Sequence, residues 1–269
     1  MLTRTLKMSF WVIYDHMGKL IVANVIWAVA IAFPGTIAGV ALFSGDVATV
    51  VFIGVPALTV AVGVVLPVGS AGLAHMIKML IDHKDGSLSD MLGGIRMYWR
   101  RASGIGLTSL GLTACLGTSV WFYASALQDR APLAGYVLSA LALWCLVFFG
   151  VTALLLMPAL VQKKQGTLAT LRLAVLLVLD NPLLMIGLAF QVLLLTIVTV
   201  PVWPLFFVLY GAAVLVMASC AYELMARRYA TLETAKSHGV AADALPAPAD
   251  EEDDYLNRGL RDVFFPWKG

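Results

Sequence analysis

The chain has few charged side chains for its length. Only 13% of its 269 residues are Asp, Glu, Lys or Arg, whereas 61% are hydrophobic and the mean hydropathy is +0.90. A soluble domain of this composition would expose large apolar patches to water. A lipid bilayer accepts such a surface, and it requires continuous apolar runs of about 20 residues. The composition therefore excludes an ordinary soluble protein and predicts an all-α, polytopic membrane helix bundle.

The sequence also lacks the short motifs that mark common active sites. It has no HExxH, no GxSxG nucleophile elbow, no P-loop and no Rossmann glycine string. Its four histidines are scattered, at His16, His75, His83 and His238. The nearest approach to a metal site would be His75 and His83 with Asp82 or Asp85, but exposed loop histidines are the better interpretation. We expect no enzymatic activity, no cofactor and no metal.

Cysteine is scarce as well. Cys115, Cys145 and Cys220 all lie in apolar runs, without CxxC spacing. Such cysteines are typical of small packing residues in a helix bundle. No signal peptide with a small-residue cleavage site precedes the first apolar run, so we expect that run to remain as a membrane anchor.

Six apolar runs are long enough to cross a bilayer. They lie at about residues 20–43, 47–80, 102–127, 133–161, 183–200 and 205–226. Pro56 and Pro67 are expected to kink the second run. Small residues that permit close helix approach occur in the first and third runs, as Gly35 and Gly39 and as Gly104, Thr108, Gly111 and Cys115.

Three further segments, residues 2–17, 87–101 and 167–179, have the pattern of interfacial amphipathic helices. Apolar stripes at helical spacing mark the first two, namely Leu6, Phe10, Ile13 and Met17, and then Leu88, Met91, Leu92, Ile95, Tyr98 and Trp99. The third is apolar apart from Arg172 and should lie deeper. Each precedes a pair of spans, at spacings of about 80 residues, which suggests a threefold repeat of amphipathic helix plus hairpin. The alternative is six spans joined by ordinary interfacial loops.

The basic residues give the expected orientation. Of the eighteen Lys and Arg residues, only Arg130 falls on the opposite side of the six predicted spans from the rest. The main anchors on the basic side are Arg96, Arg100, Arg101, Lys163, Lys164, Arg227 and Arg228. The positive-inside rule then places both termini in the cytoplasm.

The composition changes after the last span. Residues 1–236 are expected to form the transmembrane domain, and the small, acidic, Pro-containing residues 237–254 a disordered linker. Residues 255–269 are apolar again and are expected to dock on the membrane or on the protein's own cytoplasmic face. The side chains available for this are Leu256, Leu260, Phe264, Phe265 and Trp267.

No charged residue is predicted at the bilayer midplane, where ion-coupled carriers usually keep one. The candidate polar sites within the bundle are Asn24, Thr36, Gln191 and Thr196. Hydrogen bonds between helices explain such residues better than a substrate path does, although the proline-kinked spans leave that second interpretation open.

Several stretches carry a resemblance to a known family. They are Lys19-Leu20 with Asn24, Trp27 and Pro34-Gly35-Thr36; Pro67 through Gly72-Leu73-Ala74; Gly86, Asp90 and Arg100-Arg101; and Leu260-Arg261-Asp262 with Pro266-Trp267. In these the chain resembles the YesL-like family of bacterial integral membrane proteins of unknown function. The resemblance implies a multi-span protein of the kind often linked with carbohydrate uptake, and it offers no catalytic residues.

The sequence therefore favours a non-enzymatic accessory or regulatory partner of another membrane system, with carbohydrate uptake as the leading context. The alternative is a small-solute transporter or facilitator that uses the kinked spans. The expected partners are the lipid bilayer and another membrane protein or transporter, and no nucleic acid.

Overall fold

A computed structural model describes residues 1–125, 131–163, 165–238 and 254–258. This part of the chain contains helices and no strands. Six of its helical runs are long and apolar enough to cross a membrane: Met17–Leu42, Val47–His83, Leu88–Ser125, Pro132–Lys163, Pro182–Thr199 and Phe206–Thr234. The predicted all-α, six-span bundle is confirmed, and the protein is a multi-pass membrane protein.

The second run stays helical through both of its prolines. It consists of α3 (Val47–Thr49), η1 (Val50–Gly54), α4 (Val55–Val60), η2 (Ala61–Val65) and α5 (Leu66–His83), where η marks a π-helical turn. Pro56 and Pro67 each stand in the first turn of the α-helical segment that follows a π-turn. Because proline lacks an N–H and crowds the preceding turn, the wider π-turns let the helix continue past it.

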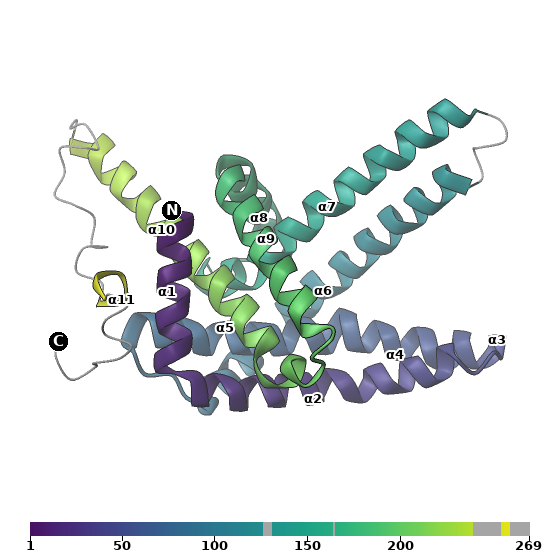
Figure 1. The fold of residues 1–269 in the computed structure, drawn as a ribbon, viewed down its shortest axis with the longest axis horizontal. Helices are drawn as coiled ribbons and strands as arrows, with labels where there is room; N and C mark the ends of the chain where they lie inside the picture. The colour runs from purple at the N-terminus through teal and green to yellow at the C-terminus, as the bar shows by residue number, and fades with distance from the viewer. Residues whose placement is uncertain (126–130, 164, 239–253, 259–269) are drawn as a thin grey trace.

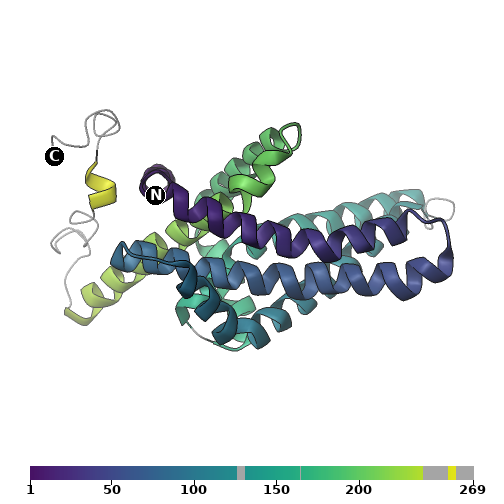
Figure 2. The same ribbon diagram turned by 90° about the horizontal axis from the view of Figure 1, so that it is seen from below.

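The spans of the described chain form three helix pairs, and the shorter helices α1, α8 and α11 lie outside these pairs (Figure 1). The helix α2 (Met17–Leu42) runs beside the α3–α5 run, and α6 (Leu88–Ser125) pairs with α7 (Pro132–Lys163). The two pairs diverge as arms away from a common base (Figures 1 and 2). The third pair is α9 (Pro182–Thr199) with α10 (Gly211–His238), preceded by the π-turn η3 (Phe206–Tyr210). In the final span 67% of the most apolar window is buried, against 11% in α6, so this span is the central helix of the bundle.

The predicted interfacial helix at residues 87–101 is not a separate element. It is the first part of α6, which continues without interruption into the third span. The predicted helix start is present, because the Ser87 backbone N–H and hydroxyl both donate to Asp90 Oδ2, at 2.8 and 2.7 Å. Met91 and Tyr98 of the stripe are buried, and the Tyr98 hydroxyl donates to the Val161 carbonyl. Part of the stripe therefore packs against α5 and α7, while Leu88, Leu92 and Trp99 remain 37–56% exposed. The segment is the start of a span and not a separate membrane-surface helix.

The α5–α6 pair is held at very short range by glycines. A Cβ atom added to Gly72 would lie 2.5 Å from Ile95 Cγ1 and 2.7 Å from the Met91 carbonyl oxygen. One added to Gly94 would lie 2.6 Å from His75 Cβ. Close approach of this kind lets two helices in lipid gain dispersion contacts along their backbones.

The first helix, α1 (Leu2–Asp15), has two distinct apolar faces. Its contact with α10 buries Thr5, Met8, Ser9 and Val12. Phe10 and Met17 of the predicted stripe, and Tyr14 beside it, remain between 41% and 46% exposed. The stripe is therefore available to the headgroup layer, while the face that the sequence analysis missed attaches α1 to the bundle.

The short helix α11 (Asp254–Asn257) packs on α1. Tyr255 is 2% exposed, and the Lys7 ammonium donates to the Leu256 carbonyl. The remaining docking candidates Leu260, Phe264, Phe265 and Trp267 lie outside the described residues, as does most of the predicted linker. The helix α10 extends to His238, so its last two residues overlap the predicted start of that linker at residue 237.

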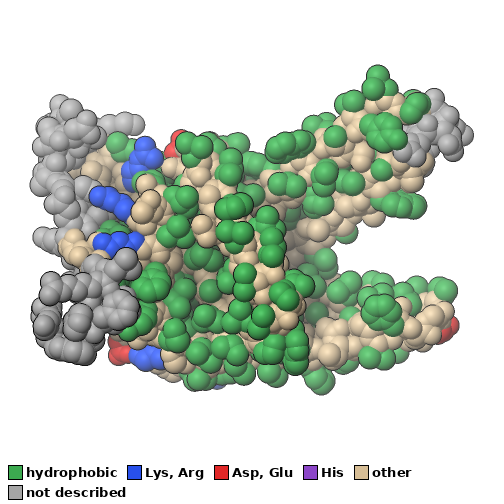
Figure 3. All heavy atoms as spheres, viewed as in Figure 1, with side chains coloured by type: hydrophobic (Ala, Val, Ile, Leu, Met, Phe, Trp, Pro, Cys, Tyr) green, Lys and Arg blue, Asp and Glu red, His purple; other side chains and the backbone are tan. Residues whose placement is uncertain are grey.

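Lysine and arginine side chains gather at one end of the molecule, around α1 and α10 (Figure 3). The opposite end is formed by the tips of the two arms, where Asp46 caps α3 by accepting hydrogen bonds from the Ala48 and Thr49 amides. Lys164 and Arg130 lie outside the described part of the chain. Among the described residues, the charge asymmetry that the sequence predicts is thus present in three dimensions.

Candidate functional site

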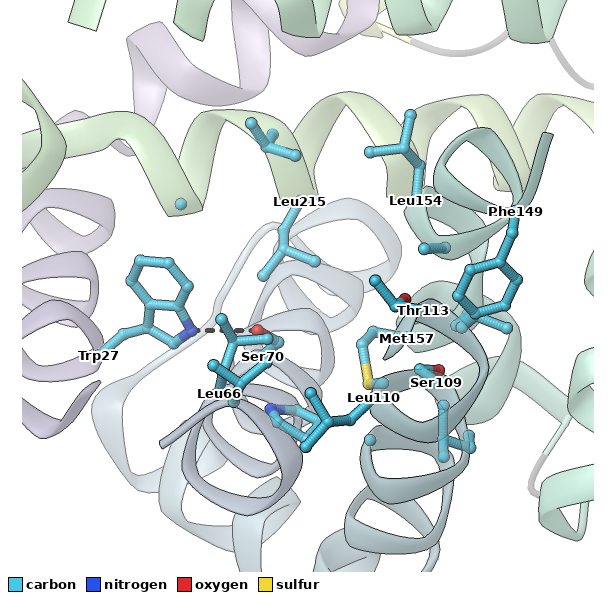
Figure 4. A pocket seen from close by; sticks show the side chains of 18 of the residues that line it. Trp27, Leu66, Ser70, Ser109, Leu110, Thr113, Phe149, Leu154, Met157 and Leu215 are labelled. Atoms are coloured by element: carbon cyan, nitrogen blue, oxygen red, sulfur yellow. Dashed lines mark hydrogen bonds between the residues drawn. The ribbon is translucent and has the colours of Figure 1, made fainter. Parts of the chain in front are cut away.

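A cavity of about 370 Å³ lies at the base of the two arms, where they meet the third helix pair (Figure 4). Its walls come from α2, the η2–α5 segment, α6, α7 and the start of α10. The lining is almost entirely apolar, and no acidic, basic or histidine side chain of the described residues contributes to it. The volume falls within the range of about 300–1,000 Å³ that is typical of small-molecule sites.

Trp27 forms one wall of this cavity. Its indole Nε1–H donates to Ser70 Oγ at 3.0 Å (Figure 4). The ring is held in place by two glycines, because Cβ atoms added to Gly69 and Gly211 would lie 3.0 and 2.6 Å from it. The side chain is therefore fixed in orientation by packing on two other helices.

Two further hydroxyl groups line the cavity, from Ser109 and Thr113 of α6. Ser109 Oγ is buried and has no hydrogen-bond partner among the described residues. Buried polar groups are normally paired, because leaving one unpaired costs about 1–3 kcal/mol. Among the described residues that line the cavity, Ser109 is thus the one whose buried hydroxyl oxygen has no hydrogen-bond partner.

Asn24, the first of the predicted polar candidates, lies beside this cavity but is engaged by the fold. Its Nδ2 donates to the Phe206 and Phe207 carbonyls at 2.9 and 2.7 Å, and its Oδ1 accepts from the Ala212 amide at 2.8 Å. The side chain is fully buried. These contacts clamp α2 onto the π-turn η3, whose irregular backbone leaves groups that a regular helix would pair.

The other three candidates are dispersed. The Thr196 hydroxyl donates to the Val192 carbonyl and lies 2.9 Å from the Tyr210 hydroxyl, and Tyr210 lines the cavity. Thr36 is exposed and donates to the Phe33 carbonyl in its own helix, next to Pro34. Gln191 is half-buried on α9, away from the cavity lining. The structure does not bring the four together into one site.

A second polar group of residues occupies the basic end of the bundle. The Glu223 carboxylate accepts from Arg227 Nε at 3.0 Å and from Gln162 Nε2 at 3.2 Å. Asp82 and Ser219 border the same small space, which at about 10 Å³ is no larger than one water molecule. The Gln162–Glu223 hydrogen bond joins α7 to α10, and Asp82 of α5 borders the same space.

The remaining predicted anchors lie around this end. Arg228 NH1 donates to Asn181 Oδ1 at 3.3 Å, which ties α10 to the junction between α8 (Thr167–Asp180) and α9. Exposed positions at the same end are occupied by Arg96, Arg100, Arg101 and Lys163. The Arg100 guanidinium lies 5.2 Å from the centre of the Trp99 ring.

The histidines do not converge with the nearby aspartates. The His75 ring packs on Tyr98 of α6, with the ring centres 5.8 Å apart. Asp85 forms an ion pair with Lys19 at 3.1 Å. Within the described ranges no group of three or more His, Cys, Asp or Glu side chains could hold a metal ion.

His16 gives the contact between α1 and α11 a pH dependence. Its Nε2 lies 3.2 Å from the Tyr255 hydroxyl, and burial lowers the pKa of the imidazole, with the Asp15 and Asp85 carboxylates opposing and Lys19 and Arg258 reinforcing the shift. Because the folded-state pKa lies below the unfolded value, folding favours the neutral ring, and stability falls as the pH drops through about 6.5.

We expect the Tm of the wild type to fall from pH 7.5 to pH 5.5 by more than that of His16→Asn, as measured by differential scanning fluorimetry. A larger loss in the variant would contradict this assignment.

The sequence analysis missed Trp27, Ser70 and Ser109 as residues of one cavity. Each looks like an ordinary residue of an apolar run, and only the convergence of α2, α5 and α6 brings them together. No family model, curated protein or solved structure matches the chain, so the geometry of these helices carries the functional argument.

Proposed function

We propose that the protein is a non-enzymatic accessory or regulatory partner of another membrane system in the bacterial plasma membrane. The observation that carries this proposal is that no other helix of the described chain covers certain glycine-bearing faces of the two arms. Gly35 and Gly39 of α2, and Gly111 of α6, would have no described atom within 4 Å of an added Cβ. In lipid, such faces are where a second helix approaches closely.

The burial of the spans supports the same conclusion. Only 11% of the most apolar window of α6 and 17% of that of the Val47–His83 run is buried within the chain. Large side chains such as Phe52, Trp121 and Trp144 are more than 70% exposed along the arms. Aromatic side chains in such exposed positions are frequent anchors of helix–helix interfaces.

The proposed orientation places both termini in the cytoplasm. Its support is the cluster of Lys and Arg side chains at the end that carries α1 (Figure 3). A cytoplasmic leaflet is negatively charged and attracts such a cluster. The partner would then meet the arms within the bilayer and the basic end at the cytoplasmic surface.

The resemblance to the YesL-like family suggests a carbohydrate uptake system as the partner. The cavity argues against sugar transport by this chain itself, because its lining is apolar apart from a few hydroxyl groups. A sugar has many hydroxyl groups, and each would need a hydrogen-bond partner on leaving water. The role that fits the geometry is therefore association with a transporter.

Filling the open face of α2 tests the proposal. Leucine at both Gly35 and Gly39 should lower the amount of partner that co-purifies in a mild detergent by roughly tenfold, equivalent to about 1.4 kcal/mol. The yield and Tm of the variant itself should match the wild type, because both positions are open. The measurement is quantitative mass spectrometry of the protein purified from native membranes.

Gly150→Leu is the matched control, because Gly150 of α7 is also open but has leucine, not glycine, four residues away on either side, so it offers no Gly-x-x-x-Gly face. It should leave the co-purified partner unchanged. If the wild type always purifies alone while liposomes that contain it transport a solute, the chain is a transporter and the accessory role is wrong.

A further inference from the structure

The cavity opens toward the space between the two arms. Its floor is buried, with Ile105, Leu156 and Ser70 at 0%, 2% and 7% exposure. Its rim is exposed, with Val62 at 37% and Thr113 also on the surface. Both rim residues lie on the arms, at η2 and α6, whose outer faces carry hydrophobic side chains (Figure 3). A molecule dissolved in the bilayer can therefore reach the cavity without crossing water.

The lining restricts the charge of any occupant. An ionised ligand would lose its hydration without finding an opposite charge, at a cost of several kcal/mol. An uncharged and largely apolar molecule gains about 25 cal/mol for each Å² of apolar surface that the walls cover. Aromatic rings from Trp27, Phe149 and Tyr210 contribute to these walls and suit a flat or unsaturated group.

Two serine hydroxyls restrict the ligand further. Ser109 Oγ has no partner in the described chain, and Ser70 Oγ accepts from Trp27 but donates to no described residue. Four other hydroxyl residues of α6, Thr108, Thr118, Ser119 and Ser125, donate to carbonyls of their own helix. The Ser103 hydroxyl is buried and without a partner in the described chain, like that of Ser109, but Ser103 lies outside the cavity lining. Neither hydroxyl proton of Ser109 and Ser70 has an acceptor in the described chain. A ligand that supplies acceptor atoms would satisfy both, provided that the Ser109 hydroxyl turns from the cavity wall toward it.

We propose that this cavity binds a neutral membrane lipid that bears carbonyl groups. The carbonyl oxygens accept hydrogen bonds from Ser109 of α6 and Ser70 of α5. The hydrocarbon part lies against the apolar walls and leaves past Val62 and Thr113 into the space between the arms. Isoprenoid quinones and diacylglycerol esters share this chemistry. The site is independent of the proposed accessory role, because the open glycine faces lie elsewhere on α2 and α6.

Binding is tested with purified full-length protein and three probes: decylubiquinone, dioctanoylglycerol and hexadecane. A ligand that binds only the folded state raises the Tm in a saturable way. We expect saturable stabilisation by at least one carbonyl probe and none by hexadecane. Response to decylubiquinone alone identifies a ring ketone as the recognised group, and response to dioctanoylglycerol alone identifies an ester.

Two variants locate the site. Ala153→Phe fills the cavity from α7 and should abolish the shift, whereas Ala140→Phe, at an exposed position of the same helix, should retain it. Ser109→Ala should weaken the apparent Kd roughly fivefold to tenfold through the lost hydrogen bond. The ligand-free Tm of the same variant should be no lower than that of the wild type, because the substitution removes a buried hydroxyl that has no partner there to lose.

Three outcomes would overturn the proposal. One is the absence of a saturable shift with both carbonyl probes in the wild type. The second is equal binding of these probes by Ala153→Phe, if that variant folds, or by Ser109→Ala if it does not. The third is equal stabilisation by hexadecane, which would show that the carbonyl groups are not recognised. Loss of partner binding in the Gly35 and Gly39 variant would change none of these results, so the two proposals can fail separately.

Discussion

Gly106→Val is expected to prevent stable folding of the bundle. A Cβ atom at Gly106 would lie 2.3 Å from the Gly63 carbonyl oxygen and 2.3 Å from Pro67 Cγ. The first of these is a backbone atom in a π-turn next to a proline, so it cannot move aside as a flexible side chain would. Forcing α5 and α6 apart would also loosen the contacts at Gly72 and Gly94. We expect a loss of more than about 3 kcal/mol, seen as a sharply reduced monodisperse yield and a lower Tm.

The matched control is Gly111→Val on the same helix. It makes the same chemical change in the same backbone conformation, but the added Cβ meets nothing within 4 Å in the described structure. Its Tm should stay close to that of the wild type, because valine and glycine differ little in helix propensity compared with the steric cost at Gly106. Equal losses of stability in the two variants would contradict this explanation. They would show that α6 needs glycine for its own backbone conformation and not for its close approach to the neighbouring helix.

The number of the spans and several of their limits follow from the sequence because of one physical constraint. A backbone in lipid must satisfy its hydrogen bonds internally, so an apolar run of sufficient length becomes a helix. The predicted run at residues 133–161 corresponds to α7 at Pro132–Lys163, and that at 183–200 to α9 at Pro182–Thr199. The polar turns between the runs set these boundaries.

The packing of the spans does not follow in the same way. The sequence points to Gly35 and Gly39 as a close-approach pair, yet both are open, whereas a Cβ added at Gly106 would lie only 2.3 Å from the Gly63 carbonyl oxygen. All four are glycines in apolar runs, and lipid and protein offer similar apolar surroundings. Periodicity therefore cannot tell which face of a membrane helix meets another helix.

The segment at residues 88–101 shows a related difficulty. Its stripe and basic residues are typical of a helix on the membrane surface. Part of that stripe packs on α5, because Gly72 and Gly94 carry no side chains that would keep the two helices apart, while Leu92 and Trp99 stay more than half exposed. A pattern of apolar spacing predicts a buried face, but whether lipid or protein covers that face depends on residues elsewhere in the chain.

Asn24→Leu is expected to destabilise the protein more than any other substitution of a buried polar side chain considered for the bundle. It removes three hydrogen bonds, to the carbonyls of Phe206 and Phe207 and from the amide of Ala212. Leucine has a similar size, so the walls stay filled while backbone groups of η3 lose their partner in a site without water. The cost should be about 2–4 kcal/mol, measured by reversible unfolding in mixed micelles of increasing sodium dodecyl sulfate content.

Thr36→Val separates this effect from a general loss of polar groups. Both residues lie on α2, but the Thr36 hydroxyl is exposed and bonds only to the Phe33 carbonyl of its own helix. Its replacement should change the unfolding free energy by less than about 0.5 kcal/mol. If Asn24→Leu lowers the unfolding free energy equally little, water or lipid can replace the amide at η3. The Asn24 hydrogen bonds then do not hold the third helix pair against α2.

If the loss of unfolding free energy is large, Trp27 should also leave its fixed position, because Asn24 and Trp27 lie one helical turn apart and both meet the start of α10. Asn24→Leu would then weaken carbonyl-lipid binding in the cavity, whereas Thr36→Val would not.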